Sequence, residues 1–286
     1  MTVTEAGTGM ANGGTVVRMG DVWDRTTQVL GGRAGALAGI AVVTSFLPLV
    51  AMLLLALIMP PTAPSTAIVT LILLIVVAAI SVLGMLAMIA LASDPATTRS
   101  DAWRLARRRV APALGISAVL ILVAILAALP AMLVLFQAKL DMASLAGTGI
   151  TKLSGGTITF LVLYYIAYLA LALWAVARLA PLNAVVLHER LGLGAIRRSV
   201  ALTRGHGWRL LGVVLLYLVV LAIVRTAVQS VVGVVFRLLL GADHIPLALM
   251  LAGATGAAVT TAFTVIAVTF TAQLYVALAA RQPTGL

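Results

Sequence analysis

Acidic and histidine side chains, the usual proton donors and acceptors of catalysis, are scarce in this sequence. The chain contains 8 Asp and Glu residues and 3 His residues. The acids lie in the N-terminal tail or in expected loops, at Glu5, Asp21, Asp24, Asp94, Asp101, Asp141, Glu189 and Asp243. His188 and Glu189 are adjacent, but neighbours in sequence do not face one another on a helix, which favours a structural role. Hydrolysis or group transfer needs a positioned acid–base set, so we expect no enzyme activity.

Metal-binding and phosphate-binding motifs are equally weak. His188, Glu189 and His206 could approach one another, but no pair of histidines has the spacing of a helical metal site. The chain has no Cys, which excludes disulfides and thiolate chemistry. It also has no Walker-type glycine loop and no serine nucleophile elbow. We therefore predict neither a metal nor a cofactor.

Arg225 is the most informative single residue, because it falls inside an apolar run. It lies about 15 residues, or about 22 Å of helix, beyond the start of that run. A charge near the centre of a bilayer costs at least a few kcal/mol. With Gln229 one turn further on, it forms a candidate intramembrane polar site. Two interpretations stay open: the guanidinium extends to the interface or bonds internally, or it faces a polar cavity and holds a phosphate or carboxylate.

Composition places the chain in a membrane. Hydrophobic residues make up 63% of it, and several runs exceed the roughly 20 apolar residues that cross a bilayer. We predict an all-α integral membrane protein with six spans, at residues 34–59, 67–92, 112–136, 158–180, 210–235 and 247–279. Pro130 should kink the third span unless neighbouring groups satisfy the freed carbonyl. Residues 1–19 have the composition of a disordered cytoplasmic tail rather than of a signal peptide.

The net charge of +11 comes from basic residues in short loops beside the spans. Such residues set topology and meet anionic lipid, so we expect phospholipid rather than nucleic acid as the partner. The densest cluster precedes the third span, and its candidate lipid-binding residues are Arg104, Arg107, Arg108 and Arg109. The same bias places both termini in the cytoplasm.

The segment from residue 178 to residue 212 is the second basic region. Pro181 should end the fourth span, and the chain then leaves the bilayer. Leu193, Ile196, Val200 and Thr203 recur at helical spacing, which predicts a short amphipathic helix lying along the headgroups. Candidate lipid-binding residues here are Arg197, Arg198, Arg204, Trp208 and Arg209. The alternative is an ordinary loop whose arginines only set topology.

Similar basic stretches precede each odd-numbered span, and Trp23 corresponds to Trp103 in two of them. This similarity predicts three tandem units, at residues 20–92, 93–180 and 181–286, each an interfacial helix followed by a membrane hairpin. The alternative is that any such hairpin is preceded by basic interfacial residues. Small residues, with Gly35 and Gly39 in the first span and Gly253 and Gly256 in the last, favour close helix packing.

The run APLNAVVLHERLGLGAIRRSVALTRGHGWRLLGVVLL resembles the bacterial glycerophosphoryl diester phosphodiesterase membrane domain family. The matching residues are Pro181, Glu189, Arg190, Ala195, Arg198, Ser199, Leu202, Thr203, Arg204, Gly205, Trp208 and Arg209. The earlier run SDAWRLARRRVAPALG is similar to the equivalent segment of the preceding unit. The family takes its name from members fused to a soluble phosphodiesterase barrel. The resemblance therefore implies a six-span architecture in the bacterial inner membrane, and it does not imply hydrolysis.

These features favour a non-enzymatic inner-membrane protein, an accessory or scaffold in envelope or lipid metabolism. Its basic interfacial helices would bind anionic phospholipid, and a membrane or cytoplasmic protein partner is left open. The alternative is a transporter or export accessory for an amphiphilic or anionic small molecule, using Arg225 and the Pro130 kink. A water-accessible cavity that reaches Arg225 would favour transport.

Overall fold

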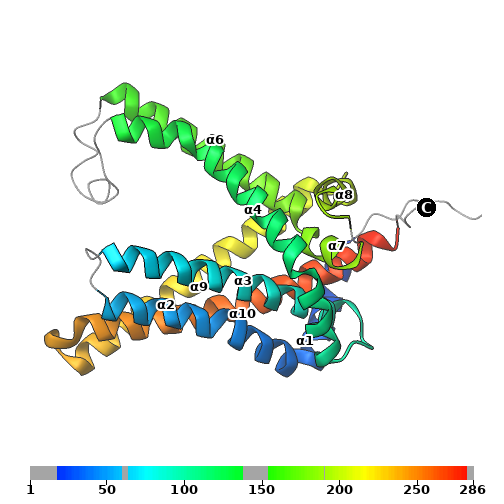
Figure 1. The fold of residues 1–286 in the computed structure, drawn as a ribbon, viewed down its shortest axis with the longest axis horizontal. Helices are drawn as coiled ribbons and strands as arrows, with labels where there is room; N and C mark the ends of the chain where they lie inside the picture. Colours follow the sequence, from blue (N-terminus) through cyan, green and yellow to red (C-terminus); the bar gives the residue numbers. More distant parts are fainter. Residues whose placement is uncertain (1–17, 60–63, 138–153, 190, 282–286) are drawn as a thin grey trace, which may run out of the picture.

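The computed structural model describes residues 18–59, 64–137, 154–189 and 191–281. Residues 1–17 of the expected tail lie outside this part, as does Arg190. Within the described residues the chain is helical and contains no strand (Figure 1). The helices are α1 (Met19–Ala41), a π-helix (Val42–Phe46), α2 (Leu47–Ile58), α3 (Pro64–Ser93), α4 (Arg99–Gln137), α6 (Gly155–Leu179), α7 (Leu182–His188), α8 (Gly194–Leu202), α9 (Gly207–Leu240), a 3-10 turn (Ala242–His244) and α10 (Ile245–Ala279).

Six helical segments are long and apolar enough to cross a membrane, which confirms the predicted all-α membrane fold. The first and third begin earlier than expected, at Met19 and Arg99, because the basic stretches before them continue into the spans without a break. The third basic stretch alone forms a separate helix, α8. Gly205, with φ of 84°, lies in the turn between α8 and α9. Such a φ strains any side chain, so glycine permits this turn. The three-unit repeat remains a prediction.

Helix α10 lies at the centre of the packing and contacts α1, α2, α3 and α9. Its small residues let these neighbours approach closely: Gly253 faces Leu53, and Gly256 faces Gln229. Packing through small residues is thus confirmed for this helix. The same expectation is wrong at Gly35, which has no neighbouring atom within 4 Å of a Cβ position.

The π-helix between α1 and α2 has an identifiable cause in Pro48. Proline has no N–H, so the carbonyl of Thr44, four residues earlier, loses its helical donor. The hydroxyl of Ser81 on α3 donates to that carbonyl instead, at 3.3 Å. Gly84, one turn further along α3, leaves the space that the Thr44 side chain occupies. The π-helix in the first span is therefore accommodated by Ser81 and Gly84 in the second span.

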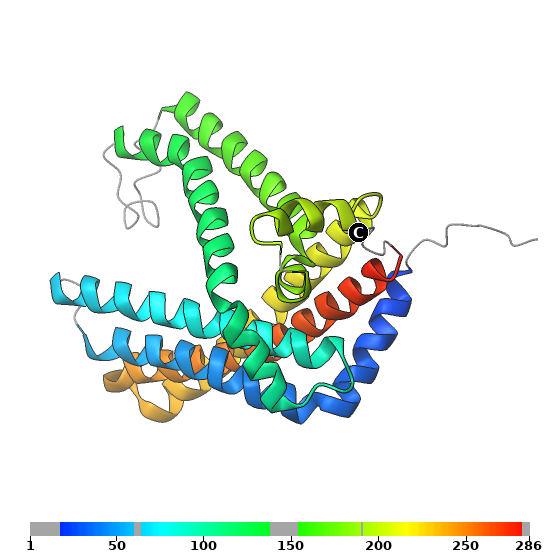
Figure 2. The same cartoon turned by 45° about the vertical axis from the view of Figure 1, so that its right-hand side comes forward.

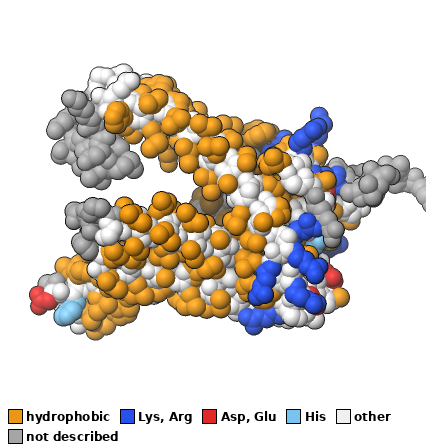
Figure 3. All heavy atoms as spheres, in the orientation of Figure 1, with side chains coloured by type: hydrophobic (Ala, Val, Ile, Leu, Met, Phe, Trp, Pro, Cys, Tyr) orange, Lys and Arg blue, Asp and Glu red, His pale blue; other side chains and the backbone are white. Residues whose placement is uncertain are grey.

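Helices α4 and α6 form an arm that diverges from α2, α3 and α10 (Figures 1 and 2). Most of its large apolar side chains are exposed, as Ile121, Leu126 and Ile166 are, and Figure 3 shows an apolar hollow between the arm and the rest. Helix α4 continues through Pro130. The Tyr164 hydroxyl on α6 donates to the carbonyl of Ala127, beside the carbonyl that Pro130 deprives of its donor.

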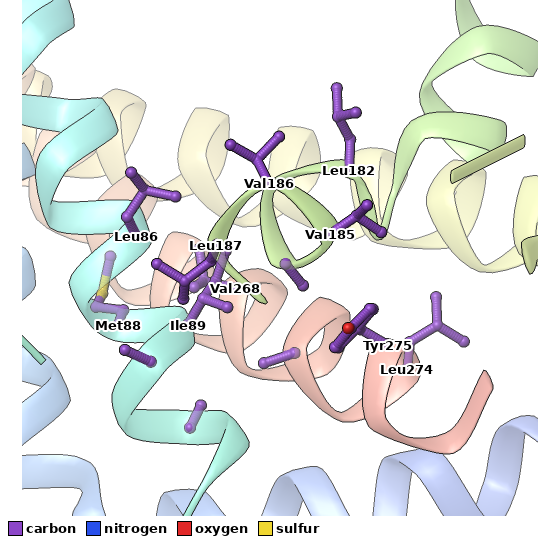
Figure 4. Packing of buried hydrophobic residues seen from close by; sticks show 14 of the residues in the cluster. Leu86, Met88, Ile89, Leu182, Val185, Val186, Leu187, Val268, Leu274 and Tyr275 are labelled. Atoms are coloured by element: carbon purple, nitrogen blue, oxygen red, sulfur yellow. The ribbon is translucent and has the colours of Figure 1, made fainter. Parts of the chain in front are cut away.

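Helix α7 was not expected from the sequence. Pro181 does interrupt the fourth span, and the residues after it form a short helix that packs into the protein core. That the chain leaves the bilayer here stays a prediction. Val185 and Leu187 are fully enclosed, and Figure 4 shows Leu187 beside Ile89 of α3 and Val268 of α10. A short helix that is apolar on every side is stable only when buried, and this one closes the end of the bundle.

Candidate functional site

The arginines gather at one end of the molecule, beside an otherwise apolar surface (Figure 3). This basic end is where α6 finishes, α8 lies and α9 begins. Helix α8 is attached to α6 through the carbonyl of Arg178, which accepts hydrogen bonds from Ser199 Oγ at 3.1 Å and Thr203 Oγ1 at 3.3 Å. Carbonyls in the last turn of a helix lack partners within the helix. Two buried hydroxyls on α8 therefore complete the end of α6 and fix the position of Arg178.

The guanidinium of Arg178 is held on several sides. It lies over the ring of Trp174, one turn earlier on α6, at 5.3 Å from the ring centroid. Its Nη1 donates to the carbonyl of Thr203 at 3.2 Å, and Gly207 leaves room for it at the start of α9. Its Nε is buried and has no hydrogen-bond partner among the described residues. The group is thus positioned by the protein while part of its hydrogen-bonding capacity is unused.

An open pocket of about 450 Å³ lies beside this guanidinium. Its lining is Trp174, Arg178, Ile196, Arg197, Val200, Ala201 and Arg204. Ile196, Arg197, Val200 and Ala201 lie on one face of α8, and Arg204 follows in the turn after that helix. Three guanidinium groups therefore meet an apolar wall, with no acidic side chain in the lining.

The predicted short helix is present as α8, and the structure shows which of its side chains face the protein. Ala195, Ser199 and Leu202 are buried, whereas Leu193 and Val200 remain exposed. The small Ala195 and Ser199 allow α8 to approach α6, and the Ser199 hydroxyl finds its carbonyl there. The larger apolar side chains are left on the outer surface, where a bilayer would cover them.

Arg198 has a different environment from Arg197 and Arg204. Its Nε donates to Glu189 Oε2 at 2.9 Å, in an ion pair that is largely enclosed. The second oxygen of Glu189 accepts a hydrogen bond from the Tyr275 hydroxyl at 3.2 Å, and His188 stacks on the Tyr275 ring. This arrangement joins the segment after α7 to α8 and α10, and it occupies the adjacent histidine and acid with structural contacts.

The remaining predicted lipid-binding residues lie outside the pocket. Arg104 pairs with Asp101 on the exposed start of α4. The rest of the basic end is formed by residues of α4 and of the start of α9. Arg107, Arg108, Trp208 and Arg209 are exposed, and Arg109 is partly buried. Trp208 is 86% exposed, as suits an aromatic side chain at a membrane interface.

Trp174 and Arg178 were missed as site residues. Their signal is the spacing of four residues at the end of a span, which places an aromatic ring and a cation on one helix face. Arg33 was also missed. Its guanidinium donates to the carbonyls of Leu91 at 2.8 Å and Asp94 at 3.1 Å, and so caps the end of α3.

Arg225 and Gln229 occupy different environments on α9. The Gln229 side chain packs against Gly256 of α10. Arg225 lies along α9 between the contacts of Gln229 with Gly256 and of Tyr217 with Phe263. The Arg225 side chain is exposed and has no hydrogen bond or ion pair with any described residue. The structure does not join it to the pocket at the basic end.

Fold and surface together define a multi-pass helical membrane protein with a basic end. Comparison with protein-family models, curated proteins and solved structures found no match for the chain. Among the described residues there is also no group of three or more His, Asp and Glu side chains that could hold a metal ion.

Proposed function

We propose that this chain is a non-enzymatic accessory or scaffold protein of the bacterial inner membrane that binds anionic phospholipid at its basic end. The observation that carries the proposal is the concentration of arginines where α4, α8 and α9 meet the apolar surface (Figure 3). Each basic side chain near an anionic surface contributes about 1 kcal/mol of attraction. The resemblance to the membrane domain family supports the same architecture and compartment.

The proposed orientation places this end in the cytoplasm. An even number of spans brings both termini to the same side, and the basic residues of short loops are retained in the cytoplasm. The cytoplasmic leaflet also carries the anionic lipids that the arginines would contact. Orientation and lipid contact thus depend on the same residues.

The test compares vesicle reconstitution and retained lipid for Arg107→Gln/Arg108→Gln/Arg109→Gln with Arg237→Gln at the opposite end of α9. We expect the triple variant to retain clearly less anionic phospholipid after mild detergent extraction, measured by native mass spectrometry. The single variant should behave as wild type. Equal lipid retention by all three proteins would refute the proposal.

A transporter for an amphiphilic or anionic molecule is the second candidate, because the Arg225 side chain is exposed within a span and has no hydrogen bond or ion pair with a described residue. Since the chain has no Cys, Arg225→Cys introduces a single thiol. A membrane-impermeant maleimide should label that thiol in vesicles if water reaches the position. Ile223→Cys, exposed on the same helix, is the control for lipid-facing positions. Labelling at neither position would remove the support for transport.

A further inference from the structure

The pocket of Trp174, Arg178, Arg197 and Arg204 concentrates positive charge, and none of the described residues that line it carries a carboxylate. The nearest carboxylate on the adjoining segment, Glu189, is already bound by Arg198 and Tyr275. The start of α9, which carries the positive end of the helix dipole, lies directly against the Arg178 guanidinium at Gly207. Like charges held together in this way repel one another unless an anion lies between them.

The geometry of Arg178 suits an oxyanion with several oxygens. Stacking on Trp174 and the bond to Thr203 fix the plane of the guanidinium. Nη1 is used by that bond, whereas Nε and Nη2 have no acceptor among the described residues. These two nitrogens form one edge of the group, and such an edge donates two parallel hydrogen bonds to a phosphate. A small opening of the pocket would bring the buried Nε within reach of a ligand.

The apolar wall indicates that the anion belongs to an amphiphile. Trp174 is 49% exposed and Val200 is 37% exposed, and both line the pocket together with Ile196. Exposed apolar side chains continue along α6 from this point, beginning with Leu171. A headgroup at the arginines could therefore extend an acyl chain along α6 and into the bilayer.

We propose that this pocket is a discrete site for the phosphate group of an anionic phospholipid, with one acyl chain against Trp174, Ile196 and Val200. The inference rests on the proposed contact of the basic end with anionic lipid, and adds that one lipid is held specifically here. Arg178 provides the fixed part of the site, and Arg197 of α8 and Arg204 of the following turn complete it.

The experiment is lipid titration of the purified full chain in detergent, followed by native mass spectrometry with phosphatidylglycerol. Arg197→Gln/Arg204→Gln removes two exposed pocket arginines that make no ion pair with a described residue, so folding should be preserved. Arg107→Gln/Arg108→Gln is the matched control, with the same charge change outside the pocket. We expect the pocket variant to bind the first lipid at least about tenfold more weakly than this control, which loses only the diffuse attraction of two basic side chains.

Equal weakening in both double variants would overturn the discrete site while leaving diffuse lipid association, and hence the proposed function, intact. An absence of anionic-lipid adducts in every protein would overturn both. Glycerol phosphate in place of the lipid tests the source of the phosphate. Binding as tight as that of phosphatidylglycerol would overturn the acyl-chain part of the inference, whereas much weaker binding supports it.

Discussion

The two halves of this molecule are held together in different ways. In the core beside the basic end, α1, α3, α7 and α10 interlock through small residues and through side chains that donate to backbone carbonyls, as Arg33 and Gln273 do. In the arm, α4 and α6 expose most of their apolar side chains and diverge from the rest (Figure 2). Lipid tails are as apolar as these side chains, so burial gives little drive for association in the bilayer. The association of the helices therefore depends on close packing and hydrogen bonds, and these are concentrated in the core beside the basic end.

Gly84 offers the strongest test of this contrast. A Cβ at this position would lie closer than 3.0 Å to Oγ1, Cβ and Cγ2 of Thr44, which is itself buried. Gly84→Ala must separate α3 from the π-helix, and we expect a loss of about 3 kcal/mol, the upper part of the range for overpacking. Thermal unfolding in detergent, followed by loss of monodisperse protein, would measure it.

Gly115→Ala is the matched control, because that position in α4 has no atom within 4 Å of the added carbon. Here alanine should leave stability unchanged or raise it by up to about 1 kcal/mol through helix propensity. Similar destabilisation by both substitutions would show that the arm is packed as tightly as the core, and the contrast would fail.

Removing the Glu189 carboxylate should cause the second largest loss of stability. Its side chain is 10% exposed, and it joins Arg198 to Tyr275, so Glu189→Ala removes the acceptor of the Arg198 Nε and of the Tyr275 hydroxyl. We expect a loss of about 2 to 3 kcal/mol, since hydrogen bonds to charged groups are worth more than neutral ones. Circular dichroism melting in detergent would detect it.

Asp101→Ala is the counterpart on the surface of α4. The Asp101–Arg104 pair is exposed, with 43% of the Asp101 side chain accessible. Exposed ion pairs contribute little, so this variant should stay within experimental error of wild type. A loss as large as that of Glu189→Ala would show that the start of α4 belongs to the interlocked half.

The six spans were predictable because each needs only a run of apolar residues long enough to cross the bilayer. Helix α7 was not, since a run of seven mostly apolar residues after a proline fits a loop, a span end or a buried turn equally well. The pairs that lock the structure are also remote in sequence. Gly84 is 40 positions from Thr44, and Glu189 is 86 positions from Tyr275. Periodicity identifies the face of a helix, but it does not identify the residue that the face meets.

The candidate site likewise contains residues that the sequence predicts and residues that only the structure reveals. Arg197 and Arg204 follow from their spacing on an amphipathic helix, and both line the pocket. Arg198 has the same local pattern, yet it turns to Glu189. The role of Arg178 depends on Ser199 and Thr203 meeting its carbonyl, which no local pattern indicates.

Replacing Tyr164 should give the smallest change in stability and the most specific one. Its hydroxyl makes the one hydrogen bond between side chain and backbone that joins the described parts of α4 and α6. Its hydroxyl donates to the carbonyl of Ala127 next to the break in the ladder at Pro130. Tyr164→Phe keeps the ring and its stacking on Phe160 but removes the donor. We expect a loss of about 0.6 kcal/mol, the average measured for such bonds between membrane helices.

The control for this variant is Tyr165→Phe, whose ring is 65% exposed on the same helix and which should have no effect. If the arm is held by this bond alone, Tyr164→Phe should also increase amide hydrogen exchange in α4 around Pro130 while leaving α3 and α10 unchanged. Exchange that rises equally in α3 and α10 would mean that the arm and the core beside the basic end unfold as one unit. The two halves would then differ in packing density but share a single cooperative transition.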